Sequence, residues 1–421
     1  MQRYNQATAR QVLATQANAS LDAALVQDVQ AILQAVKTRG DEALNDFTQK
    51  FDGVRLNSLK VSEAMIKDAF LNTNPKVIKA LQQAIANIQY YHQQQTMLPF
   101  QYERNGRIIG QQVTPIQRVG VYIPGGTAVY PSTVLMNVIP AQIAGVPSIS
   151  LTSPVQRNGE IHPTILAACY LLGIRDVYRV GGAQAIAAFT YGTQSIPRVD
   201  KIVGPGNRYV AMAKSLVLGQ VGIDTIAGPS EVCILADEFA NPQFVAADLL
   251  AQAEHDRFAR SICIATSASL LDQIEQAIIS QLPTLSRAAI AKASLDTFGM
   301  LIQVDSLDQG IDLVNTIAPE HLEIQTINPR DLLPRILHAG SIFLGAYTPE
   351  PVGDYFAGPN HTLPTSGFAR FASGLSTYDF LKRSAYVEYS QQALQEDADA
   401  IITLAKEETL TAHAESVKKR L

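Results

Sequence analysis

Gln252 and His255 have the residue types and the spacing to do chemistry together. They lie three apart in the stretch 241–257, whose apolar positions follow a helical period, so both side chains project from one face. An imidazole nitrogen and a carboxamide oxygen on one face can form half of a metal shell, although Gln is an unusual ligand. A solvated helix end is the alternative, and the spacing alone favours it.

Glu320 and His321 follow Ala-Pro and form a carboxylate–imidazole pair. Adjacent side chains point in different directions, but in a loop both can line one pocket. Such a pair can move protons on and off a hydroxyl, an aldehyde or water near neutral pH. The spacing alone favours a helix end with solvated charges over this catalytic interpretation.

Further residues could complete a metal site, because zinc is usually held by about four ligands. Gln252, His255, Asp354 and His413 could together supply two nitrogens and two oxygens, but one sequence does not show that they converge. His361 lies in a turn-rich Asn-His-Thr segment and fits a turn residue and a pocket residue equally well. The cysteines are too scattered for a thiolate site or a disulfide framework: Cys169, Cys233 and Cys263.

The segments that must position these residues alternate between strands and helices. Between 118 and 218, four apolar strands, among them 118–123 and 148–153, alternate with helices, and three of them run straight into glycine turns. This pattern is typical of a parallel, doubly wound α/β domain, in which ligands bind beyond the carboxyl ends of the strands. The G-x-G-x-x-G fingerprint is absent, because Tyr209 stands where the third glycine should be. The pattern therefore allows a nucleotide site without the usual phosphate clamp.

Length and composition exclude several classes of protein. A chain of 421 residues with 47% hydrophobic residues predicts a globular protein of two or more domains. A net charge of −5 without a basic patch argues against nucleic-acid and membrane-surface roles. The N-terminus lacks an apolar signal region, and no apolar run reaches membrane-spanning length, so we expect a cytoplasmic protein.

Nine short motifs then occur in one order along nearly the whole chain, and together they closely resemble the histidinol dehydrogenase family. They are Val121-Tyr122-Ile123-Pro124-Gly125-Gly126, Gly181-Gly182-Ala183-Gln184, Gly204-Pro205-Gly206-Asn207, Ala227-Gly228-Pro229-Ser230-Glu231, Ala251-Gln252-Ala253-Glu254-His255-Asp256, Ala318-Pro319-Glu320-His321-Leu322-Glu323, Gly353-Asp354-Tyr355, Asn360-His361-Thr362-Leu363-Pro364-Thr365 and Leu410-Thr411-Ala412-His413.

The resemblance implies oxidation of L-histidinol to L-histidine through L-histidinaldehyde, with two NAD⁺ and a bound zinc. Carried over by motif, it implies zinc ligation by Gln252, His255, Asp354 and His413. It implies catalysis by Glu320 and His321. It implies substrate contacts at Ser230, His361 and Glu408, beside the zinc ligands and the catalytic pair. It implies NAD contacts at Tyr122, Gln184 and Asn207.

We therefore predict an α/β fold with two doubly wound, Rossmann-like domains, the NAD one lacking the usual glycine fingerprint, plus small helical N- and C-terminal segments. The expected parts are an N-terminal helical segment at 1–16, a discontinuous domain with the metal and catalytic residues at 17–121 and 230–375, an NAD-binding domain at 122–229, and a C-terminal helical segment at 376–421. The resemblance also implies a homodimer in which this last segment docks on the partner subunit, so that Glu408 and His413 act in trans.

Two other functions remain open on the residues alone. A zinc hydrolase could use Glu320 as a general base and would need no cofactor. A diverged binding protein without activity is also compatible with the pattern, although the intact metal and acid–base residues count against it. Addition of histidinol and NAD⁺ to the pure protein separates these possibilities.

Overall fold

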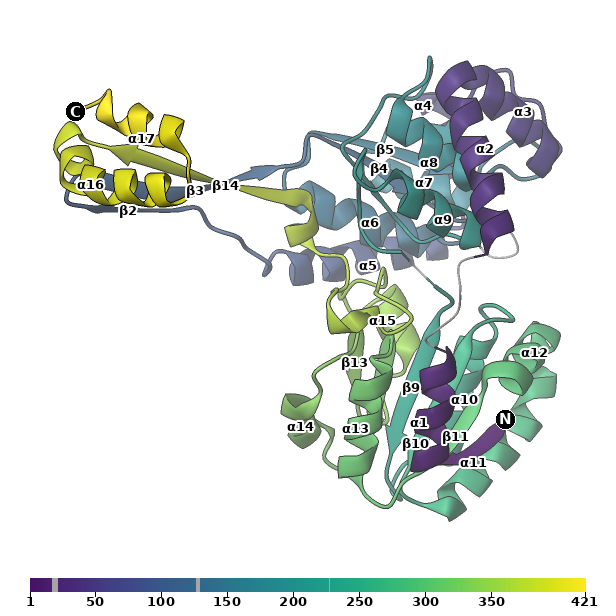
Figure 1. Ribbon diagram of the computed structural model, residues 1–421. Helices are drawn as coiled ribbons and strands as arrows, with labels where there is room; N and C mark the ends of the chain where they lie inside the picture. The colour runs from purple at the N-terminus through teal and green to yellow at the C-terminus, as the bar shows by residue number, and fades with distance from the viewer. Residues whose placement is uncertain (17–21, 126–128, 227) are drawn as a thin grey trace.

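The computed structural model describes residues 1–16, 22–125, 129–226 and 228–421. In these residues the chain forms an upper and a lower α/β unit and an arm that projects from them (Figure 1). Gly126 and Ala227, which belong to the motifs, and the predicted domain boundary at residue 17 lie outside the described residues. Within the described part of the chain, no helix has the length and apolar character needed to cross a bilayer.

The upper unit is built on a parallel sheet with the strand order β6-β5-β4-β7-β8. Alternate residues of β4 face opposite sides, because Val121 lies in one hydrophobic core and Tyr122 in the other. Helices cover both faces, which confirms the predicted doubly wound arrangement. The strands are β4 (Arg118–Tyr122), β5 (Ser148–Ser153), β6 (Asp176–Arg179), β7 (Lys201–Val203) and β8 (Gly222–Ile223). One face carries α4 (Glu63–Asn72), α5 (Pro75–His92), α6 (Pro131–Ile143) and α7 (Pro163–Leu171), and the other α2 (Ala23–Arg39), α3 (Asp41–Asp52), α8 (Gly182–Tyr191) and α9 (Arg208–Val217).

Helices α2 to α5 correct the predicted division into domains. We expected residues 17–121 to pack with residues 230–375, but these helices pack on the upper sheet instead. Val29 and Val36 of α2 share a core with Tyr122, and Ile88 of α5 shares the opposite core with Val121. An apolar stripe shows that a helix packs against something, but not against which sheet.

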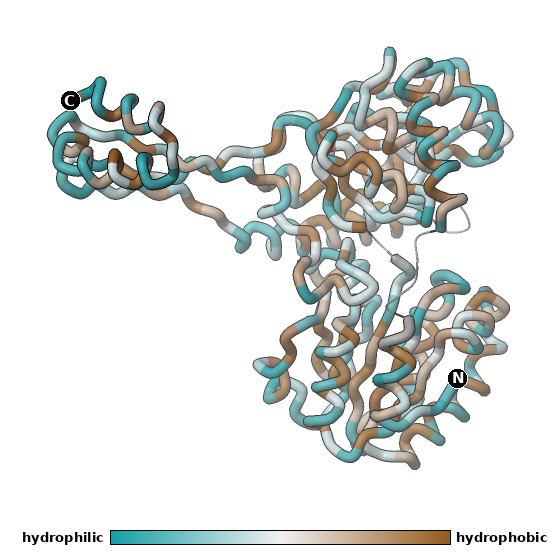
Figure 2. Tube along the Cα trace, in the orientation of Figure 1, coloured by the Kyte–Doolittle hydropathy of each residue, from teal (hydrophilic) through white to brown (hydrophobic). Residues whose placement is uncertain are grey.

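The lower unit is built on a second parallel sheet, with the order β1-β11-β10-β9-β12-β13. Figure 2 shows hydrophobic residues along its central strands. The strands are β1 (Gln2–Asn5), β9 (Glu231–Ala236), β10 (Arg260–Ala265), β11 (Met300–Gln303), β12 (His321–Gln325) and β13 (Ser341–Leu344). The helices are α1 (Gln6–Gln16), α10 (Pro242–Ala253), α11 (Ala268–Gln281), α12 (Ala288–Phe298), α13 (Leu307–Ile317), α14 (Pro329–Leu332) and α15 (Glu350–Tyr355).

The N-terminal segment is only partly helical, which corrects a second prediction. Residues 2–5 form β1, which pairs in parallel with β11 at the edge of the lower sheet. Its sequence, Gln-Arg-Tyr-Asn, carries no strand signal, so the pairing comes from the tertiary context. Arg3 fixes the strand to α11 through ion pairs with Asp272 at 2.6 Å and Glu275 at 2.8 Å.

The arm corrects a third prediction, because the C-terminal segment is not purely helical. Its strand β14 (Leu381–Tyr389) pairs antiparallel with β3 (Arg107–Pro115), which also pairs with β2 (Phe100–Arg104). Helices α16 (Gln391–Glu407) and α17 (Thr411–Lys418) complete the arm. Arg107 holds α16 to the sheet, because its Nε and Nη2 each donate to the Asp397 carboxylate at 2.7 Å. Figure 1 shows the end of the arm standing clear of both α/β units.

Candidate active site

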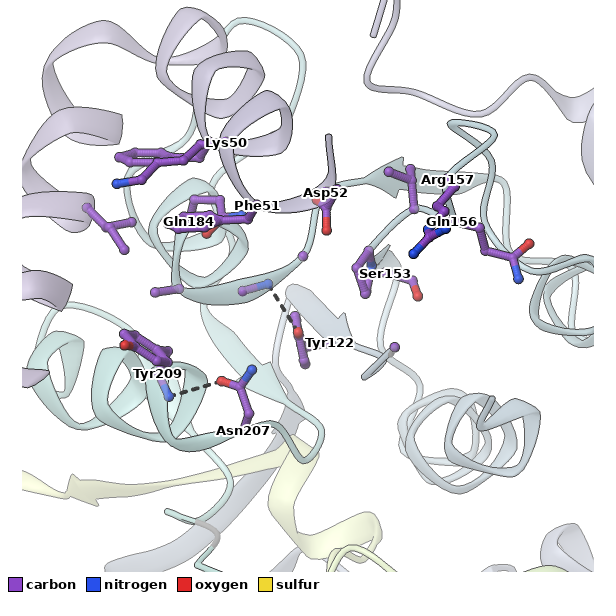
Figure 3. A pocket seen from close by; sticks show the side chains of 18 of the residues that line it. Lys50, Phe51, Asp52, Tyr122, Ser153, Gln156, Arg157, Gln184, Asn207 and Tyr209 are labelled. Atoms are coloured by element: carbon purple, nitrogen blue, oxygen red, sulfur yellow. Dashed lines mark hydrogen bonds between the residues drawn. The ribbon is translucent and has the colours of Figure 1, made fainter. Parts of the chain in front are cut away.

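A cavity of about 930 Å³ opens at the carboxyl ends of β4, β5 and β6 in the upper unit (Figure 3). It lies where the strand order reverses between β4 and β7, which is the place where open parallel sheets bind ligands. All three residues with an expected dinucleotide contact line this cavity: Tyr122, Gln184 and Asn207. The fold therefore brings them together.

Backbone groups fix two of these side chains. The phenolic oxygen of Tyr122 accepts a hydrogen bond from the N–H of Gly182 at 3.1 Å. Burial raises the pKa of Tyr122 to about 12, so the phenol stays neutral. The side chain of Asn207 caps α9 and accepts a hydrogen bond from the N–H of Tyr209 at 3.0 Å. Both residues thus stand where a helix begins, and helix N-termini favour anionic groups such as phosphate.

The turn after β7 is held by a buried ion pair. Gly204 has a φ of +110°, and a side chain there would collide with the carbonyl oxygen of Tyr122. Lys214 Nζ donates to the carbonyl of Gly204 at 3.0 Å, and the N–H of Gly204 donates to the Asp224 carboxylate at 2.7 Å. Lys214 and Asp224 pair with each other, with side chains only 2% and 3% exposed. The pair therefore fixes the backbone just before Asn207.

Replacement of Lys214 by Met is expected to lower the free energy of unfolding by about 3–5 kcal/mol, because Asp224 stays buried without its cation. Urea denaturation measures this change. Lys292→Met, which breaks an exposed pair with Asp296, is the control and should cost under about 1 kcal/mol. The double variant Lys214→Met, Asp224→Leu should recover part of the loss, and a double variant no more stable than Lys214→Met would contradict the explanation.

A second cluster of polar side chains lies in the lower unit, at the amino ends of β9, β10 and β12. Glu231, Arg260 and His321 are the first residues of these strands. The carboxyl end of α10 and the short helix α15 contribute the remaining members: Gln252, His255, Glu350 and Asp354. The polar cluster thus lies at the amino ends of the lower strands, whereas the upper cavity lies at the carboxyl ends of the upper strands.

His321 lies in a buried strand rather than in the loop or solvated helix end that its sequence context suggested. Its Nδ1 is 3.2 Å from the carbonyl oxygen of Glu231 and 3.2 Å from Gln252 Oε1. A carbonyl oxygen can only accept, so Nδ1 must carry the hydrogen and donate it. The Nε2 atom is buried without a hydrogen-bond partner in the described residues and lies 3.6 Å from Asp354 Oδ1. Nε2 is therefore the ring atom that is left without a hydrogen bond, on the side of Asp354.

Glu320 is buried beside this imidazole. Its Oε2 accepts a hydrogen bond from the N–H of Glu231 at 2.9 Å and lies 3.8 Å from His321 Nδ1. Burial raises the pKa of Glu320 to about 8, which suits a group that takes and returns protons near neutral pH. Burial opposes the charged form of His321, but the charges of Glu350 and Glu320 outweigh it and raise the pKa of the imidazole.

Next to His321, three side chains are arranged so that they could hold a metal ion. Ligand atoms of His255, Glu350 and Asp354 lie within 4.8 Å of one another. Three of the four expected zinc ligands, Gln252, His255 and Asp354, therefore meet around His321. Sequence reasoning missed Glu350, although a signal was present: it precedes Asp354 by four residues in a short helix, and this spacing puts both on one face.

His361 joins the two units at this site. Its Nδ1 is 3.0 Å from the carbonyl oxygen of Asp354, and its Nε2 is 3.1 Å from Thr133 Oγ1 of α6. Val129 lines the upper cavity, and α6 begins two residues later and carries Thr133, so residues 129–133 lead from the cavity to His361. Ser230 is half-buried and directly precedes β9. Two of the three further substrate contacts that were expected, Ser230 and His361, therefore lie beside the cluster.

Glu408 and His413 are not brought to this cluster by their own chain. Glu408 directly follows α16, His413 lies in α17, and both are exposed. Figure 1 shows α17 at the far end of the arm, away from the lower unit that holds His321. Within one chain the expected set of zinc ligands is therefore incomplete.

Known proteins resemble the chain over nearly its whole length. The family model for histidinol dehydrogenase matches residues 15–421. The histidinol dehydrogenase of Listeria monocytogenes serovar 1/2a is 53% identical over 394 residues, which cover 93% of this chain and 92% of that protein. The Bacillus subtilis histidinol dehydrogenase is 49% identical over 393 residues, with the same coverage of 93% and 92%. The crystal structure of histidinol dehydrogenase from Elizabethkingia anophelis matches with a TM-score of 0.91 at 40% identity, and covers 96% of this chain and 93% of that one.

Proposed function

This chain belongs to the histidinol dehydrogenase family, and we propose that it oxidises L-histidinol to L-histidine in two NAD-dependent steps through L-histidinaldehyde. It is an oxidoreductase of histidine biosynthesis, which removes the zinc hydrolase as an alternative. The observation that carries the detailed proposal is the buried Glu320–His321 pair at the start of β12, beside side chains suited to a metal. The test is a complete reaction with purified protein, histidinol and NAD⁺, which should form two NADH and one histidine for each histidinol consumed.

The donor set fits zinc. Gln252 offers an oxygen, His255 a nitrogen and Asp354 a carboxylate, and the exposed His413 would add a second nitrogen. The Nε2 of Gln252 and the Oε2 of Glu350 are buried without a hydrogen-bond partner among the described residues, as expected for a polar site that receives a ligand. Zinc bound there would orient the imidazole and amine of histidinol, and would draw the charge of Asp354 away from His321.

The upper cavity fits NAD. Its residues come from strand ends and helix starts, and the buried hydroxyl of Ser153 lines it without a hydrogen-bond partner in the described residues. Tyr122, Gln184 and Asn207 would contact the dinucleotide, which would accept one hydride in each step. The connection from Val129 to Thr133 would bring its reactive end toward His361 and the lower site.

Two side chains of this protein move the protons. In its neutral form, with the hydrogen on Nδ1, His321 accepts the proton of the histidinol hydroxyl at Nε2 as the carbon is oxidised to the aldehyde. Glu320 takes a proton from water while the water oxygen adds to the aldehyde carbon, and the resulting hydrate is the substrate of the second oxidation. Ser230 and His361 would position the substrate from either side of the cluster. General acid–base catalysis of this kind contributes about 10²–10⁴-fold to a rate.

We further propose a homodimer in which each arm completes the site of its partner. The exposed His413 would be the fourth zinc ligand and Glu408 a substrate contact, both acting in trans. The arm carries exposed apolar side chains that fit a protein interface: Tyr386, Val387, Leu404 and Leu410. The cysteines are buried and unpaired, which supports a reducing, cytoplasmic location.

Replacement of His255 or Asp354 by Ala is expected to remove zinc, because each change deletes one ligand. Elemental analysis measures the metal, and circular dichroism should show a retained fold, since the two sheets have cores of their own. Glu350→Gln is the matched comparison: it should keep zinc if Glu350 lies outside the shell. Full zinc occupancy in His255→Ala or Asp354→Ala would refute the ligand assignment.

A further inference from the structure

One wall of the upper cavity, the proposed NAD site, is formed by helices and not by the ends of strands. Helices α2 and α3 line this wall with Ile32, Phe47, Phe51 and Asp52, the last residue of α3. Figure 3 shows Asp52 at the cavity together with Phe51 and Tyr122. Because α2 and α3 pack into the core of the upper sheet, this wall is a fixed part of the unit.

One oxygen of the Asp52 carboxylate has no hydrogen-bond donor among the residues that the structure describes. This oxygen, Oδ2, is shielded from solvent. The nearby cation Lys50 is turned elsewhere, with Nζ 5.2 Å from the centre of the Phe51 ring. Burial raises the pKa of Asp52, which reflects the cost of its charge in this position. A bound ligand that brings hydroxyl donors would remove this cost.

The fold gives a reason why an acid is needed at this wall. In doubly wound nucleotide-binding sheets, an acidic residue accepts a hydrogen bond from the ribose 2′-hydroxyl of NAD. Here β5, the neighbour of β4 and the next strand along the chain, ends at Ser153, which carries no charge. Phe47 and Phe51 are stacked, with ring centres 5.8 Å apart, and offer an apolar surface to a base. Asp52 follows directly and can take the place of the missing acid.

The position of the wall selects one end of the dinucleotide. Figure 1 shows α3 on the outer side of the upper unit, away from the lower unit that holds His321. The reactive nicotinamide must point toward His321, so the adenosine end lies toward α3. We propose that Asp52 recognises the adenosine ribose by accepting hydrogen bonds from its 2′- and 3′-hydroxyls, so that the site selects NAD over NADP. This inference rests on the proposed use of NAD.

The electrostatics agree with this assignment. Asp52 and Tyr122 both line the cavity, and the negative charge of Asp52 adds to burial in raising the pKa of that phenol. A 2′-phosphate would bring negative charge against this carboxylate and would remove one of the two hydroxyl donors. The carboxylate therefore contributes both an attraction for NAD and a repulsion of NADP.

Calorimetric titration of the full-length, zinc-loaded protein with NAD⁺, NADP⁺ and ADP-ribose tests the proposal. Asp52→Asn is expected to bind NAD⁺ and ADP-ribose about 10- to 100-fold more weakly, because hydrogen bonds to a charged acceptor are lost. Its affinity for NADP⁺ should fall less or rise, so the ratio of the NAD⁺ affinity to the NADP⁺ affinity should become smaller than in the wild type. Asp28→Asn is the matched control, because Asp28 lines the same cavity but is exposed, and its affinities should not change.

Thermal unfolding without ligand separates recognition from a structural role. Asp52→Asn should unfold at the same or a higher temperature than the wild type, because it removes a desolvated charge. A lower unfolding temperature with unchanged affinity for NAD⁺ would make Asp52 structural and overturn the inference. Loss of NAD⁺ affinity in Asp28→Asn instead of Asp52→Asn would overturn it as well. A wild-type protein that binds neither NAD⁺ nor ADP-ribose would overturn both this inference and the proposed use of NAD.

Discussion

Glu320→Gln is expected to slow the oxidation of histidinaldehyde by about 10²–10⁴-fold while slowing the oxidation of histidinol much less, because only the aldehyde step needs an activated water. Gln can still accept the hydrogen bond that Glu320 receives from the N–H of Glu231, so the backbone at the start of β9 should not move. It cannot take a proton from water. NADH formation measured separately with histidinol and with histidinaldehyde gives both rates.

His321→Gln is the matched variant for this experiment. In the proposed mechanism His321 Nε2 accepts the proton of the substrate, so this change should reduce the first step, the one that Glu320→Gln largely spares. The unfolding temperatures of both variants show whether either substitution lowers activity by destabilising the fold. Equal losses in the two steps for Glu320→Gln would contradict the separate roles of the two residues.

A mixture of two inactive variants, His255→Ala and His413→Ala, is expected to regain activity after dissociation and reassembly. If the arm serves the partner's site, a mixed dimer has one site with both lesions and one site with neither. Random pairing makes half of the dimers mixed, so recovery should reach about a quarter of the wild-type activity. Histidinol-dependent NADH formation is the measurement, and the two variants are assayed alone in parallel.

The control mixture combines His255→Ala with Asp354→Ala. Both lesions lie in the same unit, so every possible dimer carries a defect in each site and the mixture should stay inactive. Mixed dimers of His255→Ala and His413→Ala that form but remain inactive would show that the arm serves its own chain.

Sequence reasoning predicted the strands of the upper unit closely, because a strand buried on both faces is a continuous apolar run. The predicted strands 118–123 and 148–153 correspond to Arg118–Tyr122 and Ser148–Ser153. Strand β12 escaped prediction for the opposite reason: it begins with His321 and contains the buried polar residues Glu323 and Gln325. A polar strand at a functional site looks like a loop when only hydrophobicity is considered.

The residues of the site likewise fall into those that the sequence predicted and those that only the structure revealed. The nine motifs pointed to Gln252, His255 and Asp354, and the structure brings them together. They could not reveal Glu350, which belongs to none of the motifs, or Asp52, which lies in a helix expected to pack elsewhere. The structure shows each of them with a buried carboxylate oxygen that has no donor in the described residues, and only Glu350, four residues before Asp354 in α15, had a signal in the sequence. Such an oxygen is a property of three-dimensional packing and leaves no periodic signal in a sequence.

Strand β1 has a consequence for colloidal behaviour. The edge of a sheet exposes unpaired backbone groups that can recruit strands from other molecules, and short, polar, charged edge strands suppress this. Strand β1 is such an edge, with the polar sequence Gln-Arg-Tyr-Asn and the charge of Arg3 paired to α11. Without it, the sheet would end on β11, whose Met300, Leu301 and Ile302 are fully apolar. By covering the edge of β11, residues 2–5 are expected to prevent strand pairing between molecules, although they take no part in the chemistry.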